Sequence, residues 1–420
     1  MAVNLRKREA TDSFLATLEL PQGGWVQAAC NAARDRMAAM GLPHGRDEYW
    51  KFTRPEKLLA PAGKLENDGA VSAFAETERL KLVFVGGVFD ASQSDDPSEA
   101  GIELLSAVSG LDIHWAQSLY GALETNGQNP VDRPLAALNT AVATEGVLIR
   151  VPGKAARPVE LVYQPGPEGA APVLHHVIKL EEGTELTVLE TGALGAMANT
   201  VMEVEIADGA SFHHIRTQGP ALNRRIASHI FTRLGKESAF KSFTLAAGGE
   251  LTRNECVIDL TGDDASAHVA AVAIEGAGVH HDDTIFITHG AEGCESRQVF
   301  KKVLKEGSTG VFQGKILVKP GAQKTDGYQI SQSLLLDDGA EFLAKPELEI
   351  YADDVKCSHG STSGAIDETA LYYLRARGVP KAVAQHLLVL AFLAEVTEEI
   401  ADETLREQVV ARLSDWLEAA

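Results

Sequence analysis

Apolar and polar residues alternate through the middle of the chain. The segments Ile178-Lys-Leu180 and Met202-Glu-Val-Glu-Ile206 each carry an apolar side chain at every second position. Side chains with this period of two leave a strand on one face, whereas an amphipathic helix needs spacings of three and four. The pattern therefore predicts short β-strands, each with one buried face.

A glycine turn recurs between these strands at a nearly constant interval. In each copy a glycine adjoins an acidic residue or a lysine, and successive glycines are 26, 26 and 27 residues apart at Gly183, Gly209, Gly235 and Gly262. Looser copies follow at Gly293, Gly307, Gly321 and Gly339. Repeats of this length are typical of solenoids, whose coils stack about 4.8 Å apart around a shared apolar column. We therefore expect a mainly β chain built on a right-handed parallel β-helix.

Helical patterns flank this core on both sides. Between residues 10 and 65 apolar residues recur at steps of three and four until Gly41-Leu42-Pro43 ends the run, and Leu80-Lys-Leu-Val-Phe-Val85 then indicates a strand. After residue 365, Asp367 is a candidate helix N-cap and Pro380 a candidate first residue of a second helix. We expect an N-terminal helical region over 1–70, the β-helix core over 71–350 and a C-terminal helical domain over 351–420.

The second C-terminal helix is unusually apolar, with leucine, valine and phenylalanine spread over residues 387–393. Two interpretations stay open. These residues could form a surface for a partner protein, or they could pack inside a small helical bundle.

Charge and cysteine content limit the partners and the compartment. The formal net charge of -21 disfavours a nucleic-acid partner, because such binding needs clustered Lys and Arg. We expect no membrane partner either, because no apolar run approaches the roughly 20 residues that span a bilayer. The four cysteines are scattered without a Cys-x-x-Cys pair, which indicates free thiols. A cytoplasmic protein is expected.

Several motifs then carry a family resemblance. Residues 311–330, with the segments Leu334-Leu-Leu, Pro346-Glu-Leu-Glu-Ile350 and Asp353-Asp-Val-Lys-Cys-Ser-His-Gly360 after them, are similar in order to the signature of the SufB/SufD family of iron–sulfur cluster assembly scaffold proteins. Near the N-terminus, Arg46-Asp-Glu-Tyr-Trp-Lys-Phe-Thr53 resembles the segment typical of the SufD branch.

Two positions favour the SufD branch over the alternative of a SufB-like paralogue. SufB-type chains have a cluster-building cysteine at the position aligned with Ala340, and they have Glu-His-Glu where this chain reads Cys357-Ser-His359-Gly. The resemblance implies a complex with homologues of SufB and of the ATPase SufC, in which SufC docks on the C-terminal helical region. In isolation, the chain could form a homodimer.

The resemblance also implies a scaffold, not an enzyme, and we assign no catalytic residue. A phosphate-binding Gly-x-x-x-x-Gly-Lys-Ser/Thr motif is missing: the nearest match, Gly310-Val-Phe-Gln-Gly-Lys315, is followed by Ile316, which lacks the hydroxyl group for magnesium. ATP hydrolysis is therefore expected of the SufC partner.

Cys357 and His359 are the candidate metal ligands. Two residues apart, they leave an extended segment on the same face, and thiolate and imidazole are both iron ligands. An iron–sulfur cluster usually takes about four protein ligands, so this pair supplies at most half of them. The family resemblance implies that His359 contributes at the SufB–SufD interface, with Cys357 as the weaker candidate. We expect a transient cluster there and none bound stably by the isolated chain.

Other polar groups receive no metal role. Adjacent histidines on a strand face opposite sides and cannot chelate as neighbours, and outward polar rows on a solenoid are mostly solvated surface; the residues concerned are His175, His176, His213, His214, His229, His268, His280 and His281. A β-helix carbohydrate-active enzyme would need acidic groups in a groove, and Asp263-Asp264 and Asp282-Asp283 are the candidates, although surface turns are the simpler interpretation. A solenoid without metal chemistry is the third alternative.

Overall fold

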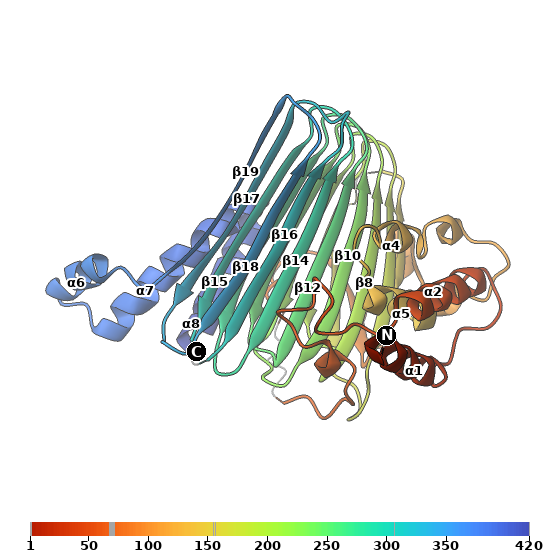
Figure 1. Ribbon diagram of the computed structural model, residues 1–420, viewed down its shortest axis with the longest axis horizontal. Helices are drawn as coiled ribbons and strands as arrows, with labels where there is room; N and C mark the ends of the chain where they lie inside the picture. Colours follow the sequence, from red (N-terminus) through yellow and green to blue (C-terminus); the bar gives the residue numbers. More distant parts are fainter. Residues whose placement is uncertain (1, 67–71, 154, 156, 306, 420) are drawn as a thin grey trace.

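The computed structural model describes residues 2–66, 72–153, 155, 157–305 and 307–419. Within these residues the chain is mainly β, and its strands form two sheets that face each other as the two walls of a solenoid (Figure 1). From β4 onward, strands that follow one another in the chain alternate between the sheets, and almost all neighbours within a sheet are parallel. The expected β-solenoid with helices at both ends is confirmed.

The first sheet contains ten strands in the order β19-β17-β15-β13-β11-β9-β7-β5-β1-β2 within the described residues. Their bounds are β1 Leu80–Val85, β2 Val88–Phe89, β5 Val159–Gln164, β7 Glu185–Gly192, β9 Ser211–Gln218, β11 Ala239–Ala247, β13 Ser266–Glu275, β15 Glu295–Leu304, β17 Thr325–Leu335 and β19 Val355–Gly364. β1 lies where the alternating pattern predicted a strand.

The second sheet contains nine strands in the order β18-β16-β14-β12-β10-β8-β6-β4-β3 over the described part of the chain. Their bounds are β3 Ile102–Leu104, β4 Val147–Val151, β6 Val173–Leu180, β8 Met197–Ile206, β10 Arg225–Leu234, β12 Leu251–Leu260, β14 His280–His289, β16 Thr309–Val318 and β18 Glu341–Ile350. One coil thus uses one strand of each sheet.

The recurring glycines form the corners where the chain passes from one sheet to the other. Gly183 and Gly209 have φ values of 66° and 67°, a left-handed conformation that glycine adopts without steric cost. The corners stack, because the Gly183 amide donates to the Asp208 carbonyl and the Gly209 amide donates to the Lys236 carbonyl. The interval of 26 to 27 residues is therefore close to the length of the coils in this part of the chain, whereas the later coils are longer, because His280 pairs with Thr309 and Thr309 pairs with Glu341.

The inner faces of both sheets form the main core. Its members come from alternate positions along the strands, including Val204, Ile230, Ile258 and Phe312. Each of these side chains is at most 4% exposed. Burial at this density supplies the stability that a single coil could not reach alone.

N-terminal helices cover the outer face of the nine-stranded sheet (Figure 1). These are α1 Ala2–Leu15, α2 Gln27–Met40, α4 Ala122–Asn126 and α5 Pro134–Val142, with the short elements η1 Pro55–Leu58, η2 Pro97–Ala100, α3 Leu105–Val108 and η3 Trp115–Ser118. α2 ends at Met40 and Gly41 follows with φ 74°, as the Gly-Leu-Pro stop predicted. Leu15, Met37 and Leu135 pack in one cluster with Met197 and Leu251 of the sheet.

The C-terminal helices follow the last strand, and the end of α7, η4 and α8 lie against the outer face of the ten-stranded sheet. Their bounds are α6 Glu368–Ala376, α7 Lys381–Ala394, η4 Glu395–Glu399 and α8 Glu403–Ala419. Val389 and Leu393 of α7 and Val409 of α8 pack in one cluster with Phe243 and Val272 of the sheet. Part of the apolar surface of α7 is therefore core, but it packs against the sheet as well as against α8, and not inside a separate helical bundle.

The expected limits between the parts can be set beside the structure. The boundary near residue 70 falls within residues 67–71, outside the described residues. The last strand, β19, extends to Gly364, and the next helix begins at Glu368, so the strands continue past residue 350. None of the helices in the described ranges combines the length and the hydrophobicity that a membrane span requires.

Candidate functional site

Cys357 and His359 lie on β19, the last strand of the ten-stranded sheet. In register with β17, Cys357 is opposite Gly327 and His359 is opposite Gln329. Cys357 packs beside the inner apolar cluster of Ile316, Val318, Ala322 and Ala352, so it points toward the interior of the last coil. Because side chains alternate along a strand, His359 leaves β19 on the same face, as the spacing predicted.

The last coil leaves this face open. β19 and β18 are the terminal strands of their sheets among the described residues, so each has a hydrogen-bonded neighbour on one side only. The inward row of β19 continues through Ser361 and Ser363, whose hydroxyls pair with Ser331 at 3.1 Å and Ser333 at 2.8 Å. In earlier coils such positions are buried, whereas His359 is exposed and Cys357 half-buried.

The electrostatics of Cys357 favour the protonated thiol. Partial burial is the main cause that raises its pKa, and the carboxylate of Asp326 acts in the same direction, against a hydrogen bond from the Gly327 backbone. The thiol must lose its proton to bind a metal, so a positive charge brought to this face would favour that loss.

This pair does not form a complete metal site within the described residues. No three His, Cys, Asp or Glu side chains gather there in a way that could hold a metal ion. The arrangement can contribute an exposed imidazole and a half-buried thiol to a site whose other ligands come from elsewhere.

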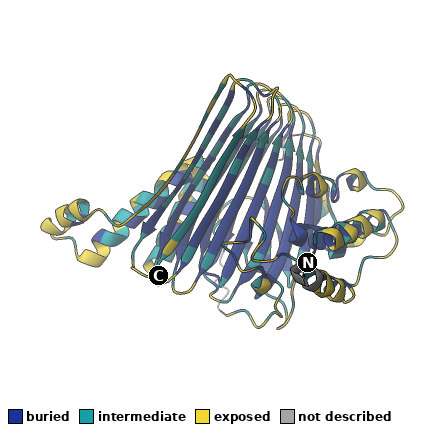
Figure 2. Cartoon of the chain, viewed as in Figure 1, coloured by how far each residue is buried: buried dark blue, intermediate teal, exposed yellow. Residues whose placement is uncertain are grey.

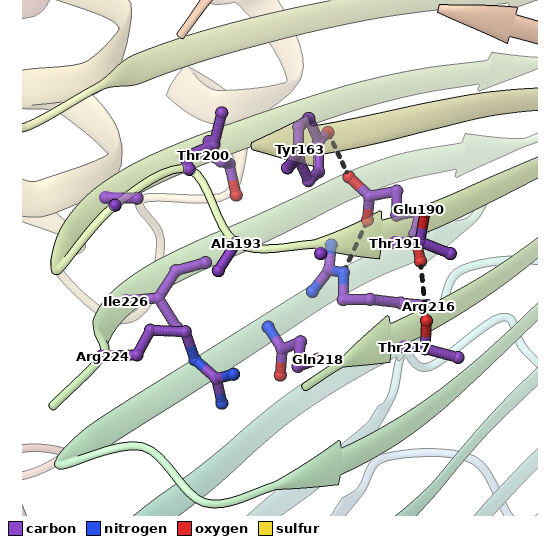
Figure 3. A pocket seen from close by; sticks show the side chains of 14 residues that line it. Tyr163, Glu190, Thr191, Ala193, Thr200, Arg216, Thr217, Gln218, Arg224 and Ile226 are labelled. Atoms are coloured by element: carbon purple, nitrogen blue, oxygen red, sulfur yellow. Dashed lines mark hydrogen bonds and ion pairs between the residues drawn. The ribbon is translucent and has the colours of Figure 1, made fainter. Parts of the chain in front are cut away.

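A second feature, which sequence reasoning missed, is a polar network in the interior of the solenoid. Glu190 accepts hydrogen bonds from the Tyr163 hydroxyl at 2.7 Å and from Arg216 Nε at 2.5 Å (Figure 3). It also accepts a hydrogen bond from His214 Nε2 at 2.8 Å. Burial alone would raise the pKa of Glu190, but Arg216 and His214 hold it well below its usual value. Glu190 is therefore an ionised carboxylate in the core.

The network borders a small cavity. Figure 3 shows the side chains of Arg216, Gln218 and Arg224 around it, and its volume is about 20 Å³. A space of this size has room for about one water molecule and not for an organic ligand. We therefore treat it as part of the core.

A further ionic group continues the network toward the last coils. Lys302 Nζ donates to Asp283 Oδ2 at 2.6 Å, and His281 lies between Asp283 at 3.1 Å and Glu275 at 2.8 Å. Asn254 connects this group to the Glu190 network. Its Oδ1 accepts a hydrogen bond from the Ser228 hydroxyl at 2.6 Å, Ser228 accepts one from Arg216, and Asn254 Nδ2 donates to Asp283. The period of two does place these residues on the inner face of their strands. Their polarity nevertheless suggests exposure to solvent, so the sequence alone did not predict that they are buried.

The expectation that the histidines are mostly solvated is wrong. His175, His176, His214, His229 and His281 are at most 2% exposed. His176 and His214 point into the solenoid, whereas His175 lies on the outer face under α5, bonded to Asn139 at 3.0 Å and Glu203 at 2.9 Å. The sequence predicted the alternation of faces correctly but not the helices that cover the outer one.

Of the two acidic pairs considered for a carbohydrate-binding groove, one is exposed and the other is buried. Asp263 and Asp264 do lie in an exposed corner turn. Asp282 and Asp283 do not, because both are buried within β14. Asp282 accepts a hydrogen bond from the Thr53 hydroxyl at 2.5 Å, and Asp283 accepts one from Lys302. A surface turn is therefore the wrong interpretation for that second pair.

The motif at the N-terminus acts as a docking segment within the chain. Trp50 is 4% exposed, and the guanidinium carbon of Arg253 lies 3.9 Å from the centroid of its ring. The side chain of Tyr49 stands edge-on to Phe286 with 4.9 Å between ring centroids. These contacts hold residues 46–53 against the outer face of the nine-stranded sheet.

At the other end, α6 and the start of α7 project away from the body of the molecule (Figure 2). Asp367 caps α6 by accepting hydrogen bonds from the amides of Thr369 and Ala370, as its position predicted. Large apolar side chains remain exposed here, among them Tyr372 at 74%, Tyr373 at 55%, Val383 at 48% and Leu387 at 44%. Such clustering on a protruding element is typical of a contact surface.

Comparison with known proteins gives the family. Residues 163–392 match the family model described as SUF system FeS cluster assembly, SufBD core domain. The chain is 30% identical over 396 residues to the iron–sulfur cluster assembly protein SufD of Escherichia coli strain K12, with 90% of each chain covered. It is 28% identical to an iron–sulfur cluster assembly SufBD family protein of Synechocystis, with 88% of this chain and 86% of that protein covered.

A second protein named SufD, from Bacillus subtilis, is 28% identical over 291 residues, which cover 67% of this chain and 66% of the relative. The resemblance seen in the motifs is thereby confirmed over more than half of the chain. The chain belongs to the SufB/SufD family of iron–sulfur cluster assembly proteins.

Proposed function

We propose that this chain is a non-ATPase scaffold subunit of a Suf-type assembly complex. It pairs with a SufB homologue through the open last coil, binds a SufC-type ATPase through its C-terminal helices, and contributes His359 to a cluster built at the seam. Cys357 is the secondary ligand on the same face. The cluster is the product under assembly, held transiently, and the isolated chain keeps none.

The observation that carries this proposal is the position of His359. The side chain is exposed on the inward row of a terminal strand, where a further coil would normally cover it. A free strand edge is a natural site for pairing with another chain. A partner docked there would bring its own ligands to the imidazole and could complete the set of about four that a cluster requires.

Two further observations support the division of labour. Gly310-Val-Phe-Gln-Gly-Lys315 lies inside β16, paired with β14 and β18, so its backbone amides are not arranged as a phosphate-binding loop. The exposed Tyr372, Tyr373 and Leu387 offer an apolar surface for another protein. ATP hydrolysis is accordingly assigned to the partner.

The test is co-expression of the chain with SufB and SufC homologues, followed by anaerobic loading with ferrous iron and sulfide. Wild type and His359→Ala are compared by size-exclusion chromatography and by visible absorption of the isolated complex. We expect His359→Ala to assemble normally and to lose most of the cluster absorption. His44→Ala, which removes an exposed imidazole from the N-terminal region, is the matched control and should change neither reading.

An unchanged absorption in His359→Ala would remove the residue from the proposed role. Loss of the complex itself would instead show that β19 serves assembly, and the ligand role would then fall to the partner alone. Replacing Tyr372 and Leu387 by serine should release the ATPase while leaving the pair of scaffold subunits intact.

A further inference from the structure

Three successive strands place their amide and imidazole side chains in one row. β15, β17 and β19 are parallel and in register, so that Gln298 is opposite Gln329 and Gln329 is opposite His359. Neighbouring strands in a sheet lie about 4.8 Å apart, within reach of a glutamine side chain. The row therefore leads from the buried interior to the exposed imidazole.

Gln329 is held in a fixed orientation within this row. Its side chain is buried, and its Nε2 donates to Gln298 Oε1 at 2.9 Å. Its Oε1 has no hydrogen-bond partner among the described residues. A buried carbonyl oxygen without a donor is unfavourable. The next residue along the row, on the neighbouring strand β19, is His359.

The opposite sheet leaves space for this amide. A Cβ atom added at Gly314 on β16 would lie 2.0 Å from Gln329 Nε2, closer than atoms can approach. Glycine at 314 thus accommodates the Gln329 side chain between the two sheets. The position of Gln329 is determined by packing from β16 as well as by the bond to Gln298.

We infer that Gln329 is a positioning residue for His359: its Oε1 accepts the N–H of one ring nitrogen and leaves the other ring nitrogen free to bind iron. Protein ligands of metals are commonly fixed in this way, because the hydrogen bond selects both the tautomer and the ring orientation. The inference rests on the proposed function, since it assigns a role toward a ligand that the chain is proposed to supply.

The direct test is the tautomer of His359 in the full-length chain. Histidine is labelled with ¹⁵N, and the ring signals of His359 are assigned by their loss in His359→Ala. We expect one dominant neutral tautomer in wild type, a mixture in Gln329→Leu, and the wild-type tautomer again in Gln329→Glu, which keeps the acceptor. Gln332→Leu is the matched control, because Gln332 lies on the other face of the same strand.

The second measurement is the amount of iron that the complex with SufB and SufC homologues retains after loading with ferrous iron and sulfide. Loss of partners that orient a metal ligand typically lowers metal affinity by about 10- to 100-fold, and we expect a loss of that order in Gln329→Leu. Should Gln329→Leu fold poorly, Gln298→Leu removes only the group that orients Gln329 and should give the same tautomer mixture.

An identical tautomer in wild type and Gln329→Leu would overturn the inference. So would a tautomer whose unprotonated nitrogen accepts from Gln329, because the amide would then compete with iron. These results differ from failure of the proposed function. In that case His359→Ala would retain its cluster, whatever the tautomer.

Discussion

The buried ion pair of Glu190 and Arg216 allows a direct test of whether the polar network inside the solenoid stabilises the fold. The substitution Glu190→Gln keeps the shape of the side chain and removes its charge. Arg216 is then left in the core, 6% exposed, without its counter-ion. Breaking a buried pair on one side costs about 3–5 kcal/mol, so we expect the free energy of unfolding to fall by about that amount.

The measurement is urea denaturation followed by circular dichroism, for the single variants and for the double variant Glu190→Gln/Arg216→Met. If the charges stabilise each other, the double variant should be less destabilised than the sum of the two single variants, by about 1–3 kcal/mol. Glu182→Gln, in an exposed corner turn, is the control and should change stability by less than about 0.5 kcal/mol.

The same pair predicts a dependence on pH. The pKa of Glu190 in the folded chain is well below the value of 4.5 for a free glutamate. Its contribution is therefore fully present above pH 4.5 and is lost as the pH falls through the lower, folded-state pKa. Glu190→Gln should lose less stability than wild type over this acid range. Additive single variants, or equal acid slopes, would refute the view that Glu190 is an ionised partner of Arg216.

Three further predictions concern other parts of the chain. Asp367→Ala should weaken α6 by about 1 kcal/mol, because two backbone amides lose their acceptor, and hydrogen exchange of those amides should accelerate. Gly314→Ala should displace Gln329, so the His359 tautomer should change as in Gln329→Leu while urea denaturation still shows a cooperative transition. Trp50→Ala should cost about 3–5 kcal/mol in the free energy of unfolding, and limited proteolysis should then cut near residue 50 first.

Much of the solenoid could be predicted from the sequence because its signals are local. A period of two fixes which side chains share a face, and the glycines at 183, 209, 235 and 262 give the length of the coils in that part of the chain. Both depend only on backbone geometry, so no long-range information is needed. The spacing of Cys357 and His359 is local in the same sense, and their common face was predicted correctly.

The buried histidines could not be predicted in this way. Whether His175 is solvated depends on α5, which reaches it from 36 residues away along the chain through Asn139. The burial of His214 depends on Glu190 of the neighbouring strand β7, which also binds Arg216 of the same strand as His214. In the sequence, polar residues inside a solenoid look like surface residues. The alternating pattern shows which face of the strand a side chain leaves, but it does not show whether other parts of the chain bury that face.

The two free strands of the last coil differ in a way that bears on the proposed partner. β18 carries Glu341, Lys345, Glu347 and Glu349 together with Pro346, and charges and proline on a terminal strand discourage pairing with another chain. β19 has Lys356 as its one residue among Lys, Arg, Asp and Glu, and its other side chains are mostly small and neutral. Because the strand with the imidazole is also the one with fewer obstacles to pairing, we expect a partner strand to add at β19. Introducing Ser358→Glu and Thr362→Glu should then weaken the pair of scaffold subunits at least tenfold, whereas removing the charges of Glu341 and Glu347 on β18 should leave it unchanged; equal weakening by both pairs of changes would contradict this assignment.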